Sequence, residues 1–182
     1  MCSFFLFICH RSSLLSSCKS SEIPKSISVV TSLISTRKVA VKPGLGNSSS
    51  FDMAQKPSVN TGRKLVWEDN FDGDSLDYSK WGVEVNAFGG GNGELQIFTD
   101  RKENVRVAGG HLVLEARRDN ANMMGTKREY SSGRVRTKNR GDWKYGRIEV
   151  RAKLPAGAGL WPAIWMLPTG DKYGGWAKSG EI

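Results

Sequence analysis

Two tryptophans lie four residues apart, and their side-chain type and spacing could serve to bind a ligand. If the stretch LWPAIWML is extended, Trp161, Ala163 and Trp165 share one face, and Pro162, Ile164 and Met166 share the other. At a rise of roughly 3.3 Å per residue the two indole rings lie about 13 Å apart. This separation suits aromatic platforms under neighbouring sugar rings. Two tryptophans buried in a core would show the same spacing, so both interpretations stay open here.

Glu181 is the candidate reactive carboxylate. Hydrolysis of a glycosidic bond uses two carboxylic acids that flank the bond, one as nucleophile or base and the other as acid. A strand can carry both, because residues at even offsets project from one face. Glu181 could be the first of such a pair, but no second carboxylate follows it. Glu94 and Glu149 lie far upstream, and the spacing does not place either of them beside Glu181.

Short strands must position these side chains. ELQIFT reads as a strand, Trp81 and Val83 are expected to point inward, and NVRV and HLVLEA form a hairpin around Gly109-Gly110. Residues 145–155 alternate strictly, which predicts a half-buried antiparallel strand. Its apolar face carries Ile148, Val150, Ala152 and Leu154. No segment shows a helical stripe, so the sequence predicts an all-β sandwich or barrel.

Composition divides the chain into residues 1–63, a leader or linker, and residues 64–182, a globular part. All three cysteines precede residue 19 and all six tryptophans follow residue 60, so the cysteines predict no disulfide framework for the globular part. MCSFFLFIC is a weak candidate signal peptide, because no basic residue precedes it, and it is too short to span a membrane. A transit-like leader and an untargeted one are the alternatives. We expect residues 1–63 to be mostly disordered, with ISVVTSLIS as a short apolar element.

The net charge of +9 does not indicate a nucleic-acid partner. The first 60 residues hold seven Lys/Arg against two Asp/Glu, so more than half of the excess lies outside the globular part. Within the globular part, basic residues alternate with acidic or apolar ones, as in GRIEVRAKL. This pattern is typical of a solvated sheet face.

Several ordered motifs resemble glycoside hydrolase family 16, and within it the laminarinase-like endo-β-1,3-glucanases. They are GNGELQIFTDRKENVRVAGGHLVLEARR, YSSGRVRTK, YGRIEVRAKLPAGAGLWPAIWMLP and GEI, and the resemblance runs from about Leu65 to Ile182. It implies a concanavalin-like jelly-roll sandwich of two antiparallel sheets, with the glucan in a cleft on the concave face. The family domain is longer than residues 64–182, so the resemblance also implies a jelly roll that is incomplete in this chain. We expect this stretch by itself to be poorly stable and inactive.

The resemblance assigns roles residue by residue. The family retains anomeric configuration through a glycosyl-enzyme intermediate, and its signature has the form E-[IL]-D-x-x-E or a version one residue shorter. Glu181 matches the nucleophile. The assisting Asp and the acid/base Glu, expected at 183 and at 185 or 186, have no counterpart up to Ile182. The implied sugar-binding residues are Trp161 and Trp165, which line subsites, Arg134 at the cleavage point, and Asn92, which binds the neighbouring sugar.

The resemblance implies a polysaccharide partner, β-1,3-glucan, and no required cofactor. Many family members bind a structural calcium ion, but the residues here assign no metal site. We expect the full-length protein to be a monomer, without a membrane span, in an extracellular or digestive compartment. Two other functions remain open. One is a non-catalytic β-1,3-glucan recognition protein on the same fold, and the other is a hydrolase or transglycosylase that acts on another polysaccharide.

Overall fold

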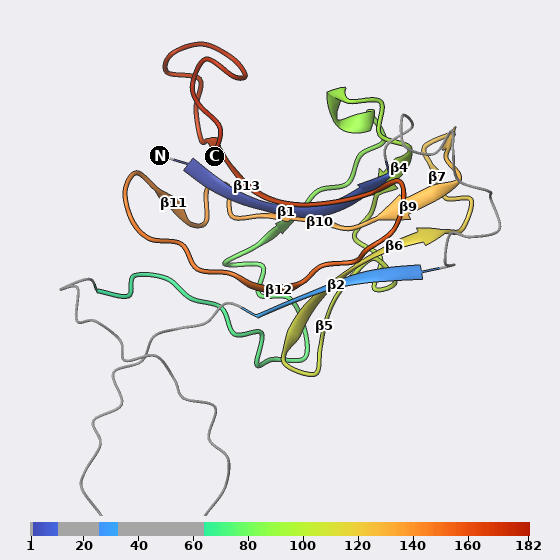
Figure 1. Ribbon diagram of the computed structural model, residues 1–182, viewed down its shortest axis with the longest axis horizontal. Helices are drawn as coiled ribbons and strands as arrows, with labels where there is room; N and C mark the ends of the chain where they lie inside the picture. The colour runs from blue at the N-terminus through green and yellow to red at the C-terminus, as the bar shows by residue number, and fades with distance from the viewer. Residues whose placement is uncertain (1, 11–25, 33–63) are drawn as a thin grey trace, which may run out of the picture.

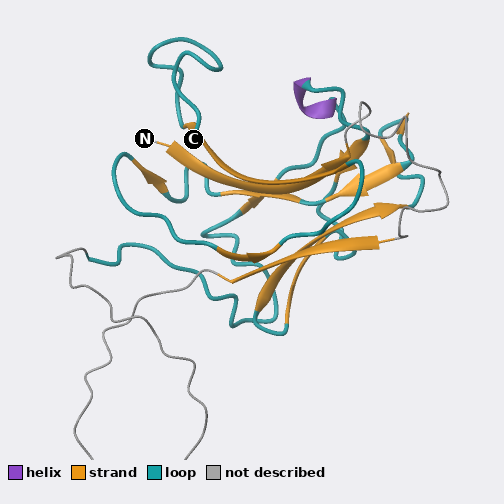
Figure 2. Ribbon diagram, in the orientation of Figure 1, coloured by secondary structure: helices purple, strands orange, loops and turns teal. Residues whose placement is uncertain are grey.

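The computed structural model describes residues 2–10, 26–32 and 64–182. Figure 2 shows them as strands and loops with one short helical turn, η1 (Gly89–Gly91). The strands are β1 (Cys2–His10), β2 (Ser26–Ser32), β3 (Gly82–Val83), β4 (Gln96–Phe98), β5 (Val105–Ala108), β6 (His111–Arg118), β7 (Asn122–Met123), β8 (Thr126–Lys127), β9 (Tyr130–Ser132), β10 (Arg134–Arg136), β11 (Asp142–Trp143), β12 (Arg151–Lys153) and β13 (Leu160–Pro168). The expected all-β class is confirmed.

Two sheets form the two layers that Figure 1 shows. The first, here called the β13 sheet, has the order β11-β1-β10-β3, with β13 paired to β1. The second, the β6 sheet, has the order β12-β2-β6-β9-β4, with β5 paired to β6. Strands β7 and β8 form a separate ribbon. Among the described strands, all ladders are antiparallel except that between β4 and β9, which is parallel. The architecture is a β-sandwich.

The hydrophobic core lies between the sheets. Val135 of β10 and Met166 of β13 contribute to it from one sheet, and Leu112, Leu114 and Ala116 of β6 contribute from the other. Each strand therefore has one face directed at the core, and its other face is free for a different task.

A cluster of tryptophans extends this core. The Trp67 ring meets the rings of Trp81 and Trp143 edge to face, with centroids 5.4 and 5.3 Å away. Trp81 is 1% exposed, and its indole N–H donates to Asp69 Oδ2 at 2.7 Å. Val83 packs against the same cluster. The predicted inward orientation of Trp81 and Val83 is confirmed.

The expected hairpin is also confirmed, because β5 and β6 pair from Val105↔Leu114 to Ala108↔His111. Gly109 and Gly110 make its turn with φ of 59° and 74°. Both values are positive, as the tight turn that best fits the twist of two strands requires, and glycine adopts them without steric cost.

Gly133 lets the chain cross from one sheet to the other. It separates β9, in the β6 sheet, from β10, in the β13 sheet. A Cβ atom at this position would lie 2.5 Å from Asn104 O and 2.6 Å from Val105 Cγ2. Glycine is therefore needed for close packing at the crossing, and the crossing brings Arg134 to the start of β10.

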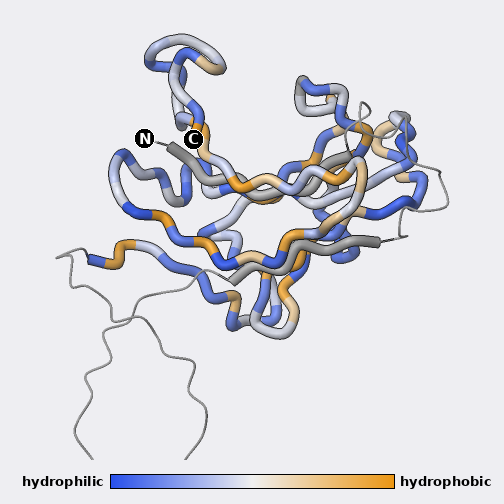
Figure 3. The backbone as a smooth tube through the Cα atoms, viewed as in Figure 1, coloured by the Kyte–Doolittle hydropathy of each residue, from blue (hydrophilic) through white to orange (hydrophobic). Residues whose placement is uncertain are grey.

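The alternating segment 145–155 is a strand over a shorter length than predicted. Figure 3 shows its alternation of hydrophobic and hydrophilic residues, but only Arg151–Lys153 form β12. Val150 packs against the core, whereas Ile148 and Leu154 are 48% and 51% exposed. Among the described strands β12 lies at the edge of its sheet and pairs with β2. An edge position gives a strand fewer neighbours to bury its apolar face.

Two stretches of residues 1–63 are strands, which the sequence did not predict. β1 pairs with β13 over all nine residues, and Phe5–Phe7 pair on its other side with β10. β2, which overlaps the predicted apolar element, pairs with β6 and β12. A short apolar run does not reveal which sheet will accept it. The rest of 1–63 lies outside the described residues, so the boundary at 63, the disorder and the signal peptide stay predictions. Within the described residues, no helix is long and apolar enough to cross a bilayer.

Candidate active site

Strand β13 presents an aromatic surface on the face that points away from the core. Trp161, Ala163 and Trp165 pack against Phe98 of β4, which is 1% exposed, while Met166 lies in the core on the other face. The predicted shared face is thereby confirmed. Both tryptophans are half-buried. Part of each indole ring therefore remains accessible to a ligand, and the rest is fixed by packing.

Arg134 of β10 lies on this aromatic surface. Its guanidinium carbon is 5.2 Å from the ring centroid of Trp165 and 5.6 Å from that of Phe98. Its Nε is 2.8 Å from Glu84 Oε2, and the arginine side chain is 8% exposed. Cation–π attraction is strengthened when the cation is withdrawn from water. Arg134 therefore supports the Trp165 ring, and little of the arginine itself is open to solvent.

The sequence missed two members of this group, Glu84 and Phe98. Glu84 Oε1 also accepts a hydrogen bond from Arg136 Nη1 at 2.8 Å, so one carboxylate holds two arginines. The alternation in VEV and RVR could have indicated a cross-strand pairing of opposite charges. Phe98 lies in the predicted strand ELQIFT, but its contact with β13 joins segments more than 60 residues apart, and sequence pattern carries no signal for that.

Glu181 projects to the same face as Trp165. The Met166 N–H donates to Ile182 O at 2.8 Å, and the Ile182 N–H donates to Met166 O at 3.1 Å. Residues that exchange both hydrogen bonds lie opposite each other with side chains on the same face. Ile182, whose side chain is 79% exposed, therefore lies on the same face of this pair as Met166, and Glu181, one residue earlier, lies on the opposite face.

Trp176 is a neighbour of Glu181 that the sequence analysis did not single out. Its indole N–H donates to Glu181 Oε2, and both side chains are exposed. A donor at one carboxylate oxygen orients the group and leaves the other oxygen available for chemistry. The five-residue spacing of Trp176 and Glu181 gave no sign of this contact.

Asn92 follows η1 and is tied to a buried carboxylate. Its Nδ2 donates to Gly90 O at 3.3 Å and to Glu94 Oε1 at 3.4 Å. Glu94 is 2% exposed, and its Oε2 accepts from Gln96 Nε2 at 2.8 Å. Gln96 and Phe98 both belong to β4. The loop that carries Asn92 is thus anchored to the strand that supports the aromatic surface.

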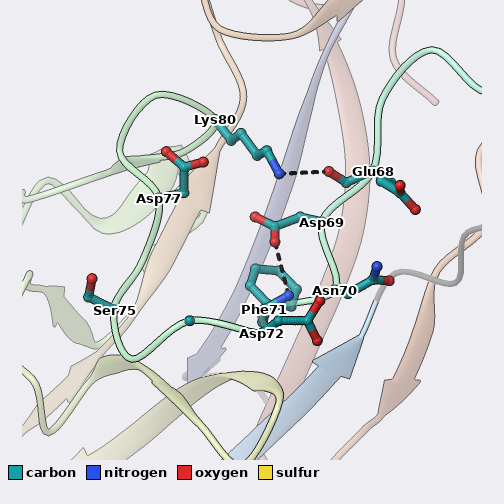
Figure 4. Close-up of a pocket in the computed structure, with 9 residues that line it drawn as sticks. Glu68, Asp69, Asn70, Phe71, Asp72, Ser75, Asp77 and Lys80 are labelled. Carbon is teal, nitrogen blue, oxygen red and sulfur yellow. Dashed lines mark hydrogen bonds between the residues drawn. The ribbon is translucent and has the colours of Figure 1, made fainter.

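A separate polar pocket lies in the segment before β3 (Figure 4). Two of its acidic side chains have partners within the protein: Asp69 Oδ1 accepts from the Phe71 N–H at 2.9 Å, and Asp77 Oδ1 accepts from the Ser79 hydroxyl at 2.6 Å. The Ser79 hydroxyl bond lowers the pKa of Asp77. The lining residues are Glu68, Asp69, Asn70, Phe71, Asp72, Gly73, Ser75, Asp77 and Lys80.

The described residues contain no group of three or more His, Cys, Asp or Glu side chains that could hold a metal ion. As in the sequence analysis, no metal site is assigned. The structure brings Trp161, Trp165 and Arg134 together and places Glu181 on their face. Asn92 is linked through Glu94 to β4, the strand whose Phe98 packs against the two tryptophans. Their roles toward a substrate remain predictions.

Comparison with known proteins places this geometry in a family. The model of "Glycosyl hydrolases family 16" matches residues 95–182. A "Beta-glucanase" of Rhodothermus marinus is 49% identical over 123 residues, covering 65% of this chain and 42% of that protein. A "Glucan endo-1,3-beta-glucosidase A1" of Niallia circulans is 44% identical over 132 residues, covering 66% of this chain and 19% of that protein.

A solved structure supports the same placement. The laminarinase from Rhodothermus marinus superposes with a TM-score of 0.60 at 50% sequence identity, over 65% of this chain and 47% of the laminarinase chain. The chain spans less than half the length of each of these proteins. The expected jelly-roll sandwich fold is confirmed. Residues 95–182 of this chain match the model of glycosyl hydrolase family 16.

Proposed function

We propose that the full-length protein hydrolyses the β-1,3-linked glucan chain of laminarin-type polysaccharides, with retention of anomeric configuration. The observation that carries this proposal is the position of Glu181 on the Trp165 face of β13, because a carboxylate beside an aromatic sugar platform is what glycoside hydrolysis needs. The names and similarity of the relatives support the choice of β-1,3-glucan.

The glucan rests on the aromatic surface of β13. Trp161 and Trp165 pack under neighbouring sugar rings, and Arg134 fixes the Trp165 ring from the side of β10. Asn92 donates or accepts hydrogen bonds at a neighbouring sugar through its side-chain amide. The half-buried rings need little rearrangement on binding, which reduces the entropy lost with each sugar bound.

Glu181 is the nucleophile. One of its carboxylate oxygens attacks the anomeric carbon while the bond to the glycosidic oxygen breaks, and that oxygen takes a proton from a second carboxylic acid. Water then attacks the same carbon, gives its proton to the second carboxylate and releases Glu181. In retaining enzymes the two carboxyl groups lie about 5–5.5 Å apart. From the family signature we expect the second acid four or five residues after Glu181.

The protein acts where polymeric glucan is found, which is an extracellular or digestive compartment. A polar polymer of this kind does not cross a lipid bilayer unaided, so the hydrolase and its substrate must lie on the same side of the membrane.

Reducing-end release from laminarin tests the proposal in the full-length protein. We expect turnover by the wild type and a loss of at least about 10³-fold in kcat for Glu181→Gln, because the neutral amide cannot form the covalent intermediate. Mixed-linkage glucan, agarose, carrageenan and xyloglucan serve as comparison substrates. Binding of laminarin without release of reducing ends would overturn hydrolysis in favour of a recognition protein. Faster turnover of another polysaccharide would overturn the choice of glucan.

A further inference from the structure

Glu84 follows β3 directly and lies opposite Arg134 of β10. The register pairs Gly82 with Arg136 and Val83 with Val135, and the Glu84 N–H donates to Arg134 O at 2.8 Å, which continues the pairing by one residue. Opposite residues of an antiparallel pair project to the same face. Glu84 and Arg134 are therefore held together by the backbone before their side chains interact.

The carboxylate of Glu84 is divided between two arginines. Oε2 is 2.8 Å from Arg134 Nε, and Oε1 is 2.8 Å from Arg136 Nη1. The side chains of Glu84 and Arg134 are 12% and 8% exposed, whereas that of Arg136 is 38% exposed. Arg134 therefore depends on Glu84 more than Arg136 does, because a buried charge is strongly disfavoured once its counter-charge is removed.

Arg134 transmits this constraint to the sugar platform. Its guanidinium is held by Glu84 while it lies over the rings of Phe98 and Trp165. Trp165 is half-buried and presents the rest of its ring on the outer face. If Arg134 turned toward water, Trp165 would lose the support on its β10 side, and the ring would have more than one orientation available.

We propose that Glu84 is a positioning residue of the glucan site, which holds Arg134 in place and through it the Trp165 ring. Glu84 acts on substrate affinity through these two side chains and takes no part in bond cleavage. The inference rests on the proposed function, since it assigns a role at the same surface.

The chemistry of the position requires glutamate. Glutamine keeps the shape and one acceptor oxygen but leaves the buried guanidinium without a counter-charge. Aspartate keeps the charge but is shorter by one carbon–carbon bond, about 1.5 Å, so it cannot reach both arginines from the same backbone position. Both variants should therefore weaken the hold on Arg134, for different reasons.

Steady-state kinetics on laminarin with the full-length protein test the inference. We expect Glu84→Gln to raise KM about tenfold, the scale of one lost cation–π support, and to leave kcat within about threefold. Glu84→Asp should change KM in the same direction and carries the test if the glutamine variant does not fold. In an Arg134→Met background, Glu84→Gln should raise KM by less than about twofold, because the effects of substituting two coupled residues are not additive.

Glu129→Gln is the matched control. Glu129 also pairs with an arginine, at 2.5 Å from Arg118 Nε, but both side chains are about 40% exposed and neither lies on β3, β10 or β13. Its KM should equal that of the wild type. A lower melting temperature for both Glu84 variants with unchanged KM would reduce Glu84 to a structural role and overturn the inference, while the proposed function would stand. A wild type that neither binds nor hydrolyses laminarin would overturn both.

Discussion

The guanidinium carbon of Arg134 lies 5.2 Å from the centre of the Trp165 ring, although β1 runs between the two strands that carry these residues. Arg134 pairs in register with Phe7 of β1, and Trp165 pairs with Phe5 on the other side. The long arginine side chain spans the intervening strand and reaches the indole face. Arg134 and Trp165 therefore behave as one unit.

Replacing Trp165 should weaken glucan binding more than its own contact with sugar would suggest. Trp165→Ala removes the platform and the ring that faces Arg134, so we expect KM on laminarin to rise by about tenfold to 100-fold. Trp165→Phe keeps a smaller ring and should lose less. A KM for Trp165→Ala equal to that of the wild type would show that the outer face of β13 does not bind the glucan.

Gly90 should be needed for the position of the Asn92 loop. Its φ is +59°, and a Cβ atom there would lie 2.1 Å from Glu94 Oε1, so Gly90→Ala forces the buried carboxylate to move. We expect a lower melting temperature and a higher KM on laminarin. Gly93→Ala is a close control, because Gly93 has a φ of +67° but no atom within 4 Å of the added Cβ.

The two alanine variants share the cost of a left-handed backbone, about 1 kcal/mol, and differ in the contact with Glu94. Gly90→Ala should therefore be the less stable of the two in thermal unfolding. Equal melting temperatures would contradict the close packing of Gly90 against Glu94.

Tyr130 should make the protein less stable at alkaline pH. Burial raises the pKa of its hydroxyl, with a further contribution from the negative charge of Glu129. A raised pKa means that the folded state favours the protonated form. The stabilisation is present below the unfolded pKa of about 10 and is lost as the pH rises through the folded pKa.

Tyr130→Phe removes this titration. Chemical unfolding between about pH 8 and about pH 11 should give a steeper fall in the free energy of unfolding for the wild type than for the variant. Parallel curves for the two proteins would contradict the raised pKa. A difference in the free energy of unfolding that is the same at every pH would reflect the lost packing of the hydroxyl. The ionisation of Tyr130 is measured by the difference in slope against pH.

Local sequence pattern predicted much of the fold. The alternation of β13 and the Gly109-Gly110 turn depend on neighbours in the chain, so period and turn chemistry indicate them. The pairing of β1 between β10 and β13 brings together residues more than 120 positions apart, and no local pattern specifies such a partner. The exposure of Ile148 and Leu154 likewise depends on the edge position of β12.

The candidate site was predictable where it follows strand periodicity and was missed where it depends on tertiary contacts. Trp161 and Trp165 share a face because of strand geometry, which the sequence shows. The near-complete burial of Arg134 follows from Glu84, the residue after β3, and from Phe98 of β4. The hydrogen bond from Trp176 to Glu181 depends on a loop conformation that residue types do not specify.

The role of Glu181 as nucleophile is tested most directly by identifying the residue that becomes glycosylated during turnover. The full-length protein is incubated with a 2-deoxy-2-fluoro β-glucosyl or laminaribiosyl fluoride, which slows hydrolysis of the covalent intermediate, and its peptides are then analysed by mass spectrometry. We predict an added glycosyl group on the peptide that contains Glu181, and no such label in Glu181→Gln. A label on another carboxylate, or turnover of laminarin by Glu181→Gln at the wild-type rate, would contradict it.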